Sequence, residues 1–332
     1  MEALLKIENL KKYFPVSTSW WKKSQTLKAV DGVSLEVFPG ETLGLVGESG
    51  CGKSTLGRTL IRLYEPTDGK IQFQGKDFLS LQGKKLREAR RQFQMIFQDP
   101  FSSLDPKMTV GQLIGQPFVI HKVLSGKALE DQVKKLLTSV GLKASHINRY
   151  PHEFSGGQRQ RICIARAMAL NPQLILADEP VSALDVSIQA QILNLLKELQ
   201  EQRNLTLIFI SHDLSVIEHM CDRIAVMYLG KIVELADREE LFRNPQHPYT
   251  KALIASIPHV GQGPRKIHRG LTGEVPSPLN PPMGCAFHPR CPQATEQCQK
   301  RIPQLRTISP QHQVACDLVL TTNNDRSSGG IS

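Results

Sequence analysis

The most constraining feature of this 332-residue sequence is the segment 47–54, GESGCGKS, which matches the pattern G-x-x-x-x-G-K-[ST]. An apolar run at residues 42–46 precedes it and a helical pattern follows it, which is the context this pattern requires. Glycines allow the backbone N–H groups and the positive end of the following helix to surround phosphate groups. Lys53 places a cation on those phosphates, and the Ser54 hydroxyl is a ligand for Mg²⁺. The segment therefore predicts a phosphate site at a strand–loop–helix junction.

Short apolar runs alternate with helical patterns along the chain. Residues 42–46, 174–178 and 206–211 are predicted strands, and apolar spacing at 128–140 and 188–199 predicts helices with one core-facing side. This alternation indicates an α/β fold with a largely parallel sheet. The apolar runs are shorter than the roughly 20 residues of a membrane-spanning helix, and no secretory signal opens the chain. We therefore expect a cytosolic chain that does not cross a membrane.

The net charge of the sequence indicates its partners, and the distribution of Pro and Gly indicates its domain boundaries. Lys and Arg number 41 against 31 Asp and Glu, a net charge of +10, which favours polyanionic or acidic-surface partners: nucleotide phosphates, nucleic acid or an anionic membrane face. From Pro258 onwards Pro and Gly become frequent, so we expect a domain boundary near Pro258 and a separate extension over 258–320. Residues 321–332 are polar and without periodicity, and we expect them to form a disordered tail.

Two adjacent carboxylates, Asp178 and Glu179, end the predicted strand at 174–178. Side chains alternate along a strand, so the two cannot share one role. Asp178 suits the surroundings of Mg²⁺, and Glu179 suits the general base that polarises an attacking water. A solvated strand end is the alternative interpretation. Downstream of a phosphate loop we favour the catalytic one.

The segment 154–161, FSGGQRQR, resembles the signature sequence of ATP-binding cassette (ABC) ATPases. Ser155 and two glycines open a helix there, whose free N–H groups are able to meet a γ-phosphate. In the family that phosphate belongs to ATP held by the other subunit of a head-to-tail dimer. The common form of the signature begins with Leu, where this chain has Phe154. The resemblance implies a P-loop ATP-binding cassette over 1–257 with a RecA-like core, a helical signature subdomain at about 99–170 and a Cys-containing C-terminal extension.

Further positions match the family one by one and in order. Gln98 resembles the Q-loop, residues 182–185 the D-loop and His212 the switch histidine. Phe14 sits best by spacing for the ring that stacks on adenine, with Tyr13 as the alternative. The resemblance implies catalytic roles for Glu179, His212 and Gln98, and Mg²⁺ contacts for Ser54, Gln98 and Asp178. It implies that ATP is bound by Phe14, Gly47, Glu48, Ser49, Gly50, Cys51, Gly52, Lys53, Ser54, Thr55, Gln98, Ser155, Gly156, Gly157, Gln158, Asp178 and Asp185.

Two C-terminal segments narrow the resemblance. Residues 244–250, NPQHPYT, and 273–282, GEVPSPLNPP, look like hallmarks of the peptide and nickel importer branch, and the chain up to residue 320 is similar to its F-type ATP-binding subunits. This implies an ATP-hydrolysing subunit of a dipeptide or oligopeptide importer on the cytoplasmic face of the inner membrane. Its implied partners are a D-type sibling subunit, two membrane permeases and an external solute-binding protein.

Other functions are possible for such a chain. A nickel importer ATPase is the nearest alternative. A soluble cassette ATPase acting on nucleic acid or ribosomes would suit the basic charge, but such proteins usually carry two cassettes, and this chain has one phosphate loop and one signature. Because this chain has a single cassette, we expect no nucleic-acid partner. A non-catalytic binding module is also disfavoured, because every hydrolytic residue is present.

Four of the seven cysteines crowd the extension, namely Cys285, Cys291, Cys298 and Cys316. Their spacings lack the C-x₂-C pair of most structural zinc sites, which weakens zinc as an interpretation. Four thiolates are the ligand set of a [4Fe–4S] cluster, and such a cluster is what the resemblance implies here. Four unligated thiols packed as small apolar groups are the third possibility. We expect a cluster with a structural role.

Overall fold

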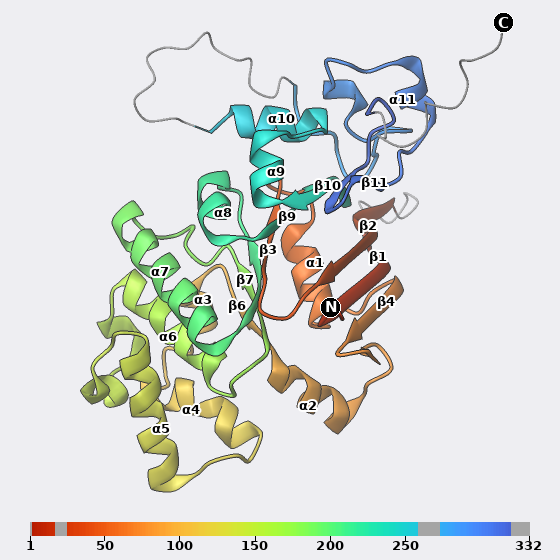
Figure 1. Cartoon of the computed structure of the whole chain (residues 1–332). Coiled ribbons are helices and arrows are strands. Elements are labelled where there is room, and N and C mark those ends of the chain that lie inside the picture. The colour runs from red at the N-terminus through yellow and green to blue at the C-terminus, as the bar shows by residue number, and fades with distance from the viewer. Residues whose placement is uncertain (1, 17–24, 258–272, 320–332) are drawn as a thin grey trace, which may run out of the picture. The chain divides into compact units, whose positions relative to one another are not determined.

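The computed structural model describes residues 2–16, 25–257 and 273–319 (Figure 1). The chain divides into two compact units. The first unit comprises Met1–Lys6, Glu36–Thr42 and Lys70–Ser211, and the second comprises Ile7–Leu35, Leu43–Gly69 and His212–Ser332. The boundary expected near Pro258 and the tail expected at 321–332 lie outside the described residues.

Three strands of the first unit pair in parallel, whereas its strands β4 (Asp68–Phe73) and β5 (Lys76–Asp77) pair antiparallel. The parallel strands β6 (Phe93–Ile96), β7 (Leu174–Asp178) and β8 (Thr206–Ile210) pair in that order, with β7 central. Every residue of β7 and β8 is buried, as expected for parallel strands covered on both faces. The strands predicted at 174–178 and 206–211 are thus confirmed, the second ending at Ile210.

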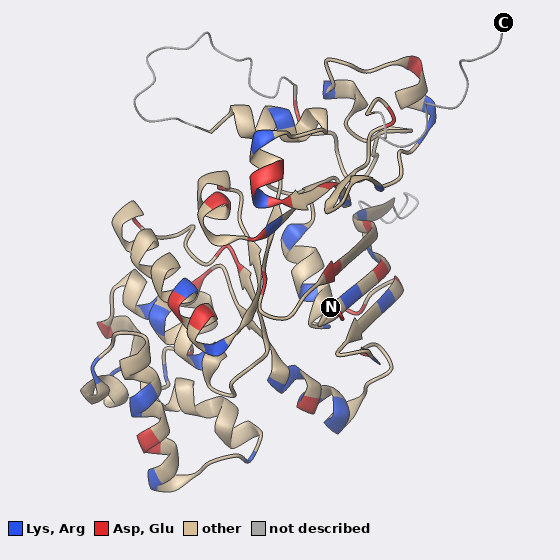
Figure 2. Ribbon diagram, viewed as in Figure 1, with Lys and Arg blue, Asp and Glu red and all other residues tan. Residues whose placement is uncertain are grey.

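Helices make up most of the first unit. The amphipathic patterns at 128–140 and 188–199 are confirmed as helices α5 (Gly126–Ser139) and α7 (Val186–Arg203). Most of their apolar residues are buried, and Leu129 and Ile188 are half-buried. Figure 2 shows Lys and Arg at several positions along the ribbon of α2 (Gly83–Gln92). The remaining elements of this unit are β4 (Asp68–Phe73), β5 (Lys76–Asp77), α2 (Gly83–Gln92), α3 (Pro100–Ser103), α4 (Val110–Ile120), α5 (Gly126–Ser139), η1 (Ala144–Asn148), η2 (Pro151–Glu153), α6 (Gly156–Met168) and α7 (Val186–Arg203).

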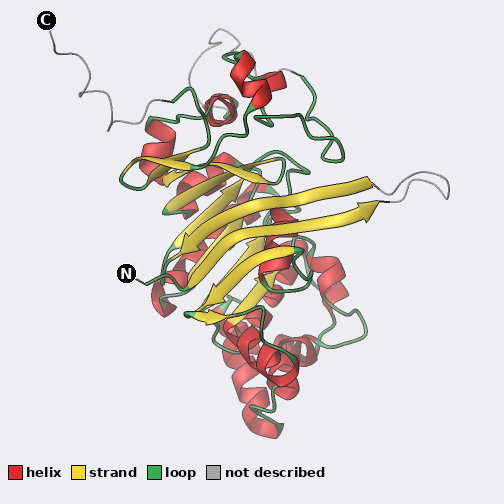
Figure 3. Cartoon of the chain, turned by 90° about the vertical axis from the view of Figure 1, so that its right-hand side faces the viewer, coloured by secondary structure: helices red, strands yellow, loops and turns green. Residues whose placement is uncertain are grey.

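The second unit is a mixed α/β structure. Its strand β3 runs parallel to β9, which pairs antiparallel with β10. The neighbouring strands β1 and β2 are the long pair in Figure 3. Its elements are β1 (Leu5–Val16), β2 (Gln25–Val37), β3 (Thr42–Val46), α1 (Lys53–Leu60), α8 (Leu214–Met220), β9 (Arg223–Tyr228), β10 (Lys231–Asp237), α9 (Arg238–Arg243), α10 (Pro248–Ala255), η3 (His288–Arg290), α11 (Glu296–Lys300), β11 (Arg306–Ser309) and β12 (His312–Val314).

The extension contributes strands to this second unit. The hairpin of β11 and β12 joins the sheet because β12 pairs antiparallel with β10, placing Val314 opposite Glu234. The sequence pattern did not predict this hairpin, since the strands are short and follow a proline-rich segment. None of the described helices is long and apolar enough to span a bilayer.

Candidate nucleotide-binding site

The phosphate-loop motif lies in the second unit, between β3 and α1. Gly47 has a φ angle of 153°, and a Cβ there would lie 2.2 Å from the carbonyl oxygen of Met227. Gly52 has a φ angle of 106°, and a Cβ there would lie 2.1 Å from the carbonyl oxygen of Ala29. Both positions therefore require glycine, for the backbone conformation and for the close packing. The sequence motif thus forms a tight loop that ends at the N-terminus of α1.

Lys53, the first residue of α1, turns its side chain back over the loop. It is only 5% exposed, and its Nζ donates to the carbonyl oxygens of Gly47 at 2.6 Å and Glu48 at 3.1 Å. Its ammonium group therefore lies beside the loop backbone, close to the positive end of a helix. A buried positive charge in this place attracts phosphate oxygens.

The carboxylates lie at the end of β7 in the first unit. Asp178 is fully buried as the last residue of the strand. Glu179 follows in a left-handed conformation at φ 45°, and its backbone N–H donates to the Ile210 carbonyl at 3.0 Å. Its carboxylate accepts a hydrogen bond from Gln98 Nε2 at 2.8 Å. The structure thus brings together Gln98 and Glu179, 81 residues apart, in the same unit.

The signature segment forms the N-terminus of α6. Ser155 caps this helix in a reciprocal capping box with Gln158, in which the Gln158 N–H donates to Ser155 Oγ at 3.4 Å. Phe154 is buried and its ring lies edge-on to that of His146, which explains how the larger residue is accommodated in place of Leu. A Cβ on Gly157 would lie 2.4 Å from Ile188 Cγ2, so this glycine allows α6 to approach α7.

The two candidate aromatic residues for adenine differ in their surroundings. The Tyr13 hydroxyl donates to Asp31 at 2.5 Å, and Asp31 also pairs with Lys231 at 2.9 Å, so this ring is fixed by a polar network. Phe14 is half-buried edge-on to Tyr64. Among the remaining expected residues, His212 and Asp185 are both exposed at helix-preceding positions.

Sequence reasoning missed the residues that contact Glu48 in the loop. Tyr249 Oη accepts a hydrogen bond from the Glu48 N–H at 2.9 Å, and Arg290 forms an ion pair with its carboxylate at 2.6 Å. They follow Glu48 by 201 and 242 residues, and Arg290 lies in no recognised motif. The only signal was that Tyr249 falls within the segment 244–250 that resembles the importer branch.

The four cysteines of the extension influence one another. The pKa of the Cys285 thiol is raised to about 11, first by burial and then by the nearby thiols of Cys298, Cys316 and Cys291. All four are free thiols, and the described part of the chain contains no group of three or more His, Cys, Asp or Glu side chains able to hold a metal ion. The structure therefore gives no support to the expected [4Fe–4S] cluster or to zinc.

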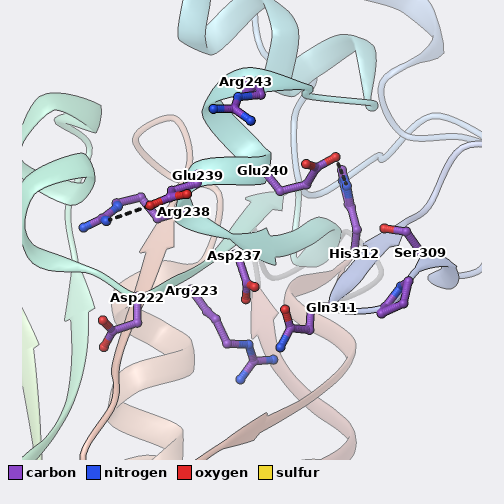
Figure 4. A pocket seen from close by; sticks show the side chains of 11 residues that line it. Asp222, Arg223, Asp237, Arg238, Glu239, Glu240, Arg243, Ser309, Gln311 and His312 are labelled. Atoms are coloured by element: carbon purple, nitrogen blue, oxygen red, sulfur yellow. Dashed lines mark ion pairs between the residues drawn. The ribbon is translucent and has the colours of Figure 1, made fainter.

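A charged cavity of about 550 Å³ lies in the second unit, lined by α9, the start of β9 and the turn between β11 and β12 (Figure 4). His312 lies at its edge, with Nε2 2.8 Å from Glu234 and Nδ1 3.6 Å from Glu240. Burial alone would lower the pKa of His312, but the hydrogen bonds and charges of the two carboxylates outweigh burial and raise it. Glu234 also accepts the backbone N–H groups of residues 246 and 247, so it joins the extension to the start of α10.

Comparison with known proteins assigns the chain to a protein family. Residues 30–182 match the ABC transporter family model, and residues 233–298 match the model of the oligopeptide/dipeptide transporter C-terminal region. The chain is 56% identical over 321 residues to the oligopeptide transport ATP-binding protein AppF of Bacillus subtilis, covering 96% of this chain and 98% of that protein. It is 49% identical to the dipeptide transport ATP-binding protein DppF of Haemophilus influenzae, covering 94% of this chain and 96% of that protein.

A solved structure agrees with this assignment. The dimeric ATP-binding cassette in a post-hydrolysis state with ADP and Pi is 29% identical, with a TM-score of 0.63 over 70% of this chain and 98% of that chain. The expected α/β cassette fold is thereby confirmed. The chain belongs to the family of ABC transporter ATP-binding proteins that carry the oligopeptide/dipeptide transporter C-terminal region.

Proposed function

We propose that this chain is the ATP-hydrolysing subunit of a peptide importer. The observation that most supports this proposal is the glycine-dependent loop at residues 47–54, which encloses the buried Lys53 ammonium at the N-terminus of α1. Close relatives of the chain are peptide transport ATP-binding proteins. Both named relatives act in peptide transport, which favours peptides over nickel. The two differ between oligopeptide and dipeptide, and the substrate class proposed here is peptides of either kind.

In this proposal the loop residues and Lys53 bind the phosphates of ATP. Ser54 would supply a hydroxyl, Asp178 a carboxylate and Gln98 an amide oxygen, which are the oxygen donors that Mg²⁺ prefers. Bound Mg²⁺ would neutralise charge on the phosphates. Glu179 accepts a proton from the attacking water, and its hydrogen bond to Gln98 orients the carboxylate. His212 contacts the γ-phosphate, and Phe14 stacks on adenine.

The ATP-bound state is a dimer in this proposal, as in the related cassette that was solved as a dimer with ADP and Pi. Ser155 caps the N-terminus of α6, and a helix N-terminus suits contact with the γ-phosphate of a second subunit. Asp185 precedes α7 and belongs to the same contact. The second subunit is a D-type sibling.

The permeases dock on the helical part of the first unit in this proposal. A groove of about 640 Å³ lies between α4, α5 and η1, with apolar residues such as Leu129 and Val133 in its lining. Val119, which also lines the groove, is 58% exposed, and the adjacent Ile120 is 50% exposed. Exposed apolar side chains around a groove mark an interaction site. In this proposal a chain docked there lies at the cytoplasmic face of the inner membrane, and an external solute-binding protein delivers the peptide to the permeases from the opposite face.

Glu179→Gln tests the hydrolytic assignment. The substitution keeps the hydrogen-bonding shape but removes the base, so ATP affinity should stay within about twofold while turnover falls by at least about 100-fold. Hydrolysis at the original rate would refute the role of Glu179. Lys53→Ala is the matched comparison, because it should weaken ATP binding itself.

Mild-detergent purification from native cells tests the partners. Mass spectrometry should find two permeases and a sibling cassette with the wild-type chain, and Val119→Glu should lose the permeases while retaining ATP binding. Recovery with ribosomes or nucleic acid and without permeases would overturn the transport function and leave the ATPase site intact.

The [4Fe–4S] cluster stays a prediction of the sequence resemblance. It is tested by anaerobic purification and assay of iron and acid-labile sulfide. If the purified protein contains neither iron nor acid-labile sulfide, the predicted cluster is refuted.

A further inference from the structure

An arginine of the C-terminal extension holds a side chain of the phosphate loop. Arg290 ends η3, and its guanidinium donates from Nη1 to Glu48 Oε2 at 2.6 Å and from Nη2 to Glu48 Oε1 at 3.0 Å. Two parallel hydrogen bonds between a guanidinium and a carboxylate fix the direction as well as the distance of the pair. Glu48 is the second residue of the phosphate motif, one position after Gly47. The extension therefore contacts the loop itself.

The pair lies in a rigid, largely apolar environment. The Arg290 side chain is 4% exposed and that of Glu48 is 25% exposed. Tyr228, Tyr249 and Phe287 surround them with ring centroids 4.7 to 5.3 Å apart, and all three are almost fully buried. Buried rings at these separations leave little freedom of movement. The carboxylate of Glu48 is therefore held in one place.

The same cluster also holds the backbone of the loop. Tyr249 Oη accepts the Glu48 N–H at 2.9 Å, and Arg290 Nη1 lies 3.4 Å from Tyr228 Oη. On the other side of the loop, Lys53 Nζ donates to the Glu48 carbonyl at 3.1 Å. Residue 48 is thus fixed through its N–H, its carbonyl and its carboxylate at once.

The charge of this pair has a consequence for phosphate binding. A carboxylate at position 48 is a negative charge on a loop that is proposed to bind a polyanion, and it opposes that binding unless it is neutralised. Arg290 supplies the neutralising charge from within a buried site, where screening by salt is weak. Without Arg290, the Glu48 carboxylate would lose its guanidinium partner and would repel the phosphates that Lys53 is proposed to attract.

We propose that Arg290 is a positioning residue for ATP. It neutralises Glu48, holds that carboxylate in one orientation and fixes the loop in its binding conformation, so that the C-terminal extension is a working part of the nucleotide site. The inference rests on the proposed phosphate role of residues 47–54.

The experiment measures the Kd for ATP of the full-length protein by isothermal titration calorimetry at pH 7.5. Arg290→Met should raise this Kd about tenfold, the effect of losing one hydrogen-bonded charge. The increase should shrink as salt is raised from 50 to 500 mM, because salt screens the exposed part of the repulsion between Glu48 and the phosphates. Arg301→Met is the matched control: Arg301 lies in the same extension, 74% exposed and 3.7 Å from Asp317, and its loss should leave the Kd unchanged.

Removal of the carboxylate distinguishes positioning from a merely structural role. In a Glu48→Gln background, Arg290→Met should change the Kd by no more than about twofold relative to Glu48→Gln alone, because no carboxylate remains for Arg290 to neutralise. This comparison keeps the proposal testable if Arg290→Met alone does not fold. An unchanged Kd in Arg290→Met, or a tenfold increase that Arg290→Met still causes in the Glu48→Gln background, would overturn the proposal.

Lys53→Ala separates this inference from the proposed function. If Lys53→Ala loses ATP affinity while Arg290→Met does not, only the inference about Arg290 fails. If Lys53→Ala retains full affinity, the phosphate site itself is wrong, and the inference falls with it.

Discussion

Gly157→Ala should destabilise the junction of the signature helix with α7. The new Cβ would lie 2.4 Å from Ile188 Cγ2, about 1 Å closer than ordinary van der Waals contact. Overpacking of this kind costs about 1–3 kcal/mol, while alanine favours a helix over glycine by about 0.5–1 kcal/mol. Because Ile188 is only half-buried and is able to yield somewhat, we expect a net loss of about 1–2 kcal/mol.

The neighbouring glycine provides the control for this prediction. A Cβ on Gly156 would lie 3.3 Å from Leu184 Cδ2, the far end of a flexible side chain, so Gly156→Ala should stay within about 0.5 kcal/mol of the wild type. Urea unfolding followed by circular dichroism measures both variants. In an Ile188→Ala background, which removes the obstructing methyl group, the cost of Gly157→Ala should disappear. Finding Gly157→Ala as stable as Gly156→Ala would refute the steric reasoning.

Three further substitutions test the packing and the charges. Thr109→Ala removes the side chain that caps α4 and should cost about 1 kcal/mol in urea unfolding, whereas Thr109→Ser should keep the cap. Tyr249→Phe leaves the Glu48 N–H without its acceptor and should cost about 1–3 kcal/mol; an unchanged melting temperature would contradict this contact. His312→Gln should lower the melting temperature more at pH 6 than at pH 9. The pKa of His312 is raised in the folded state. Its contribution to stability is therefore full below the unfolded pKa of about 6.5 and is lost as pH rises through the folded pKa. An equal loss of melting temperature at both pH values would count against the charged pairing with Glu234.

The local elements could be predicted because their signals are local. The buried strands at 42–46 and 174–178 are continuous apolar runs, and the helix Val186–Arg203 follows a regular apolar spacing. The phosphate loop could be predicted for the same reason, since its glycines are required by contacts of the loop backbone.

The contacts of Glu48 could not be predicted in this way. Position 48 is a variable position of the phosphate motif, and its partner Arg290 lies 242 residues further along the chain. No periodicity connects two such residues, because the pairing depends on how η3 packs against buried rings. Cys285 and the other clustered cysteines are a different case: their crowding was visible in the sequence, but their spacing could not determine whether they form a metal site.

The hairpin of β11 and β12 determines where the sheet of the second unit ends. Without it, β10 would present seven residues, Lys231–Asp237, with backbone groups open to pairing with another chain. The hairpin covers β10 and leaves β11, a strand of four residues, in the outer position. Short outer strands are one means by which proteins avoid sheet-to-sheet aggregation. A chain shortened before Arg306 should therefore be prone to self-association as well as lacking its C-terminal segment.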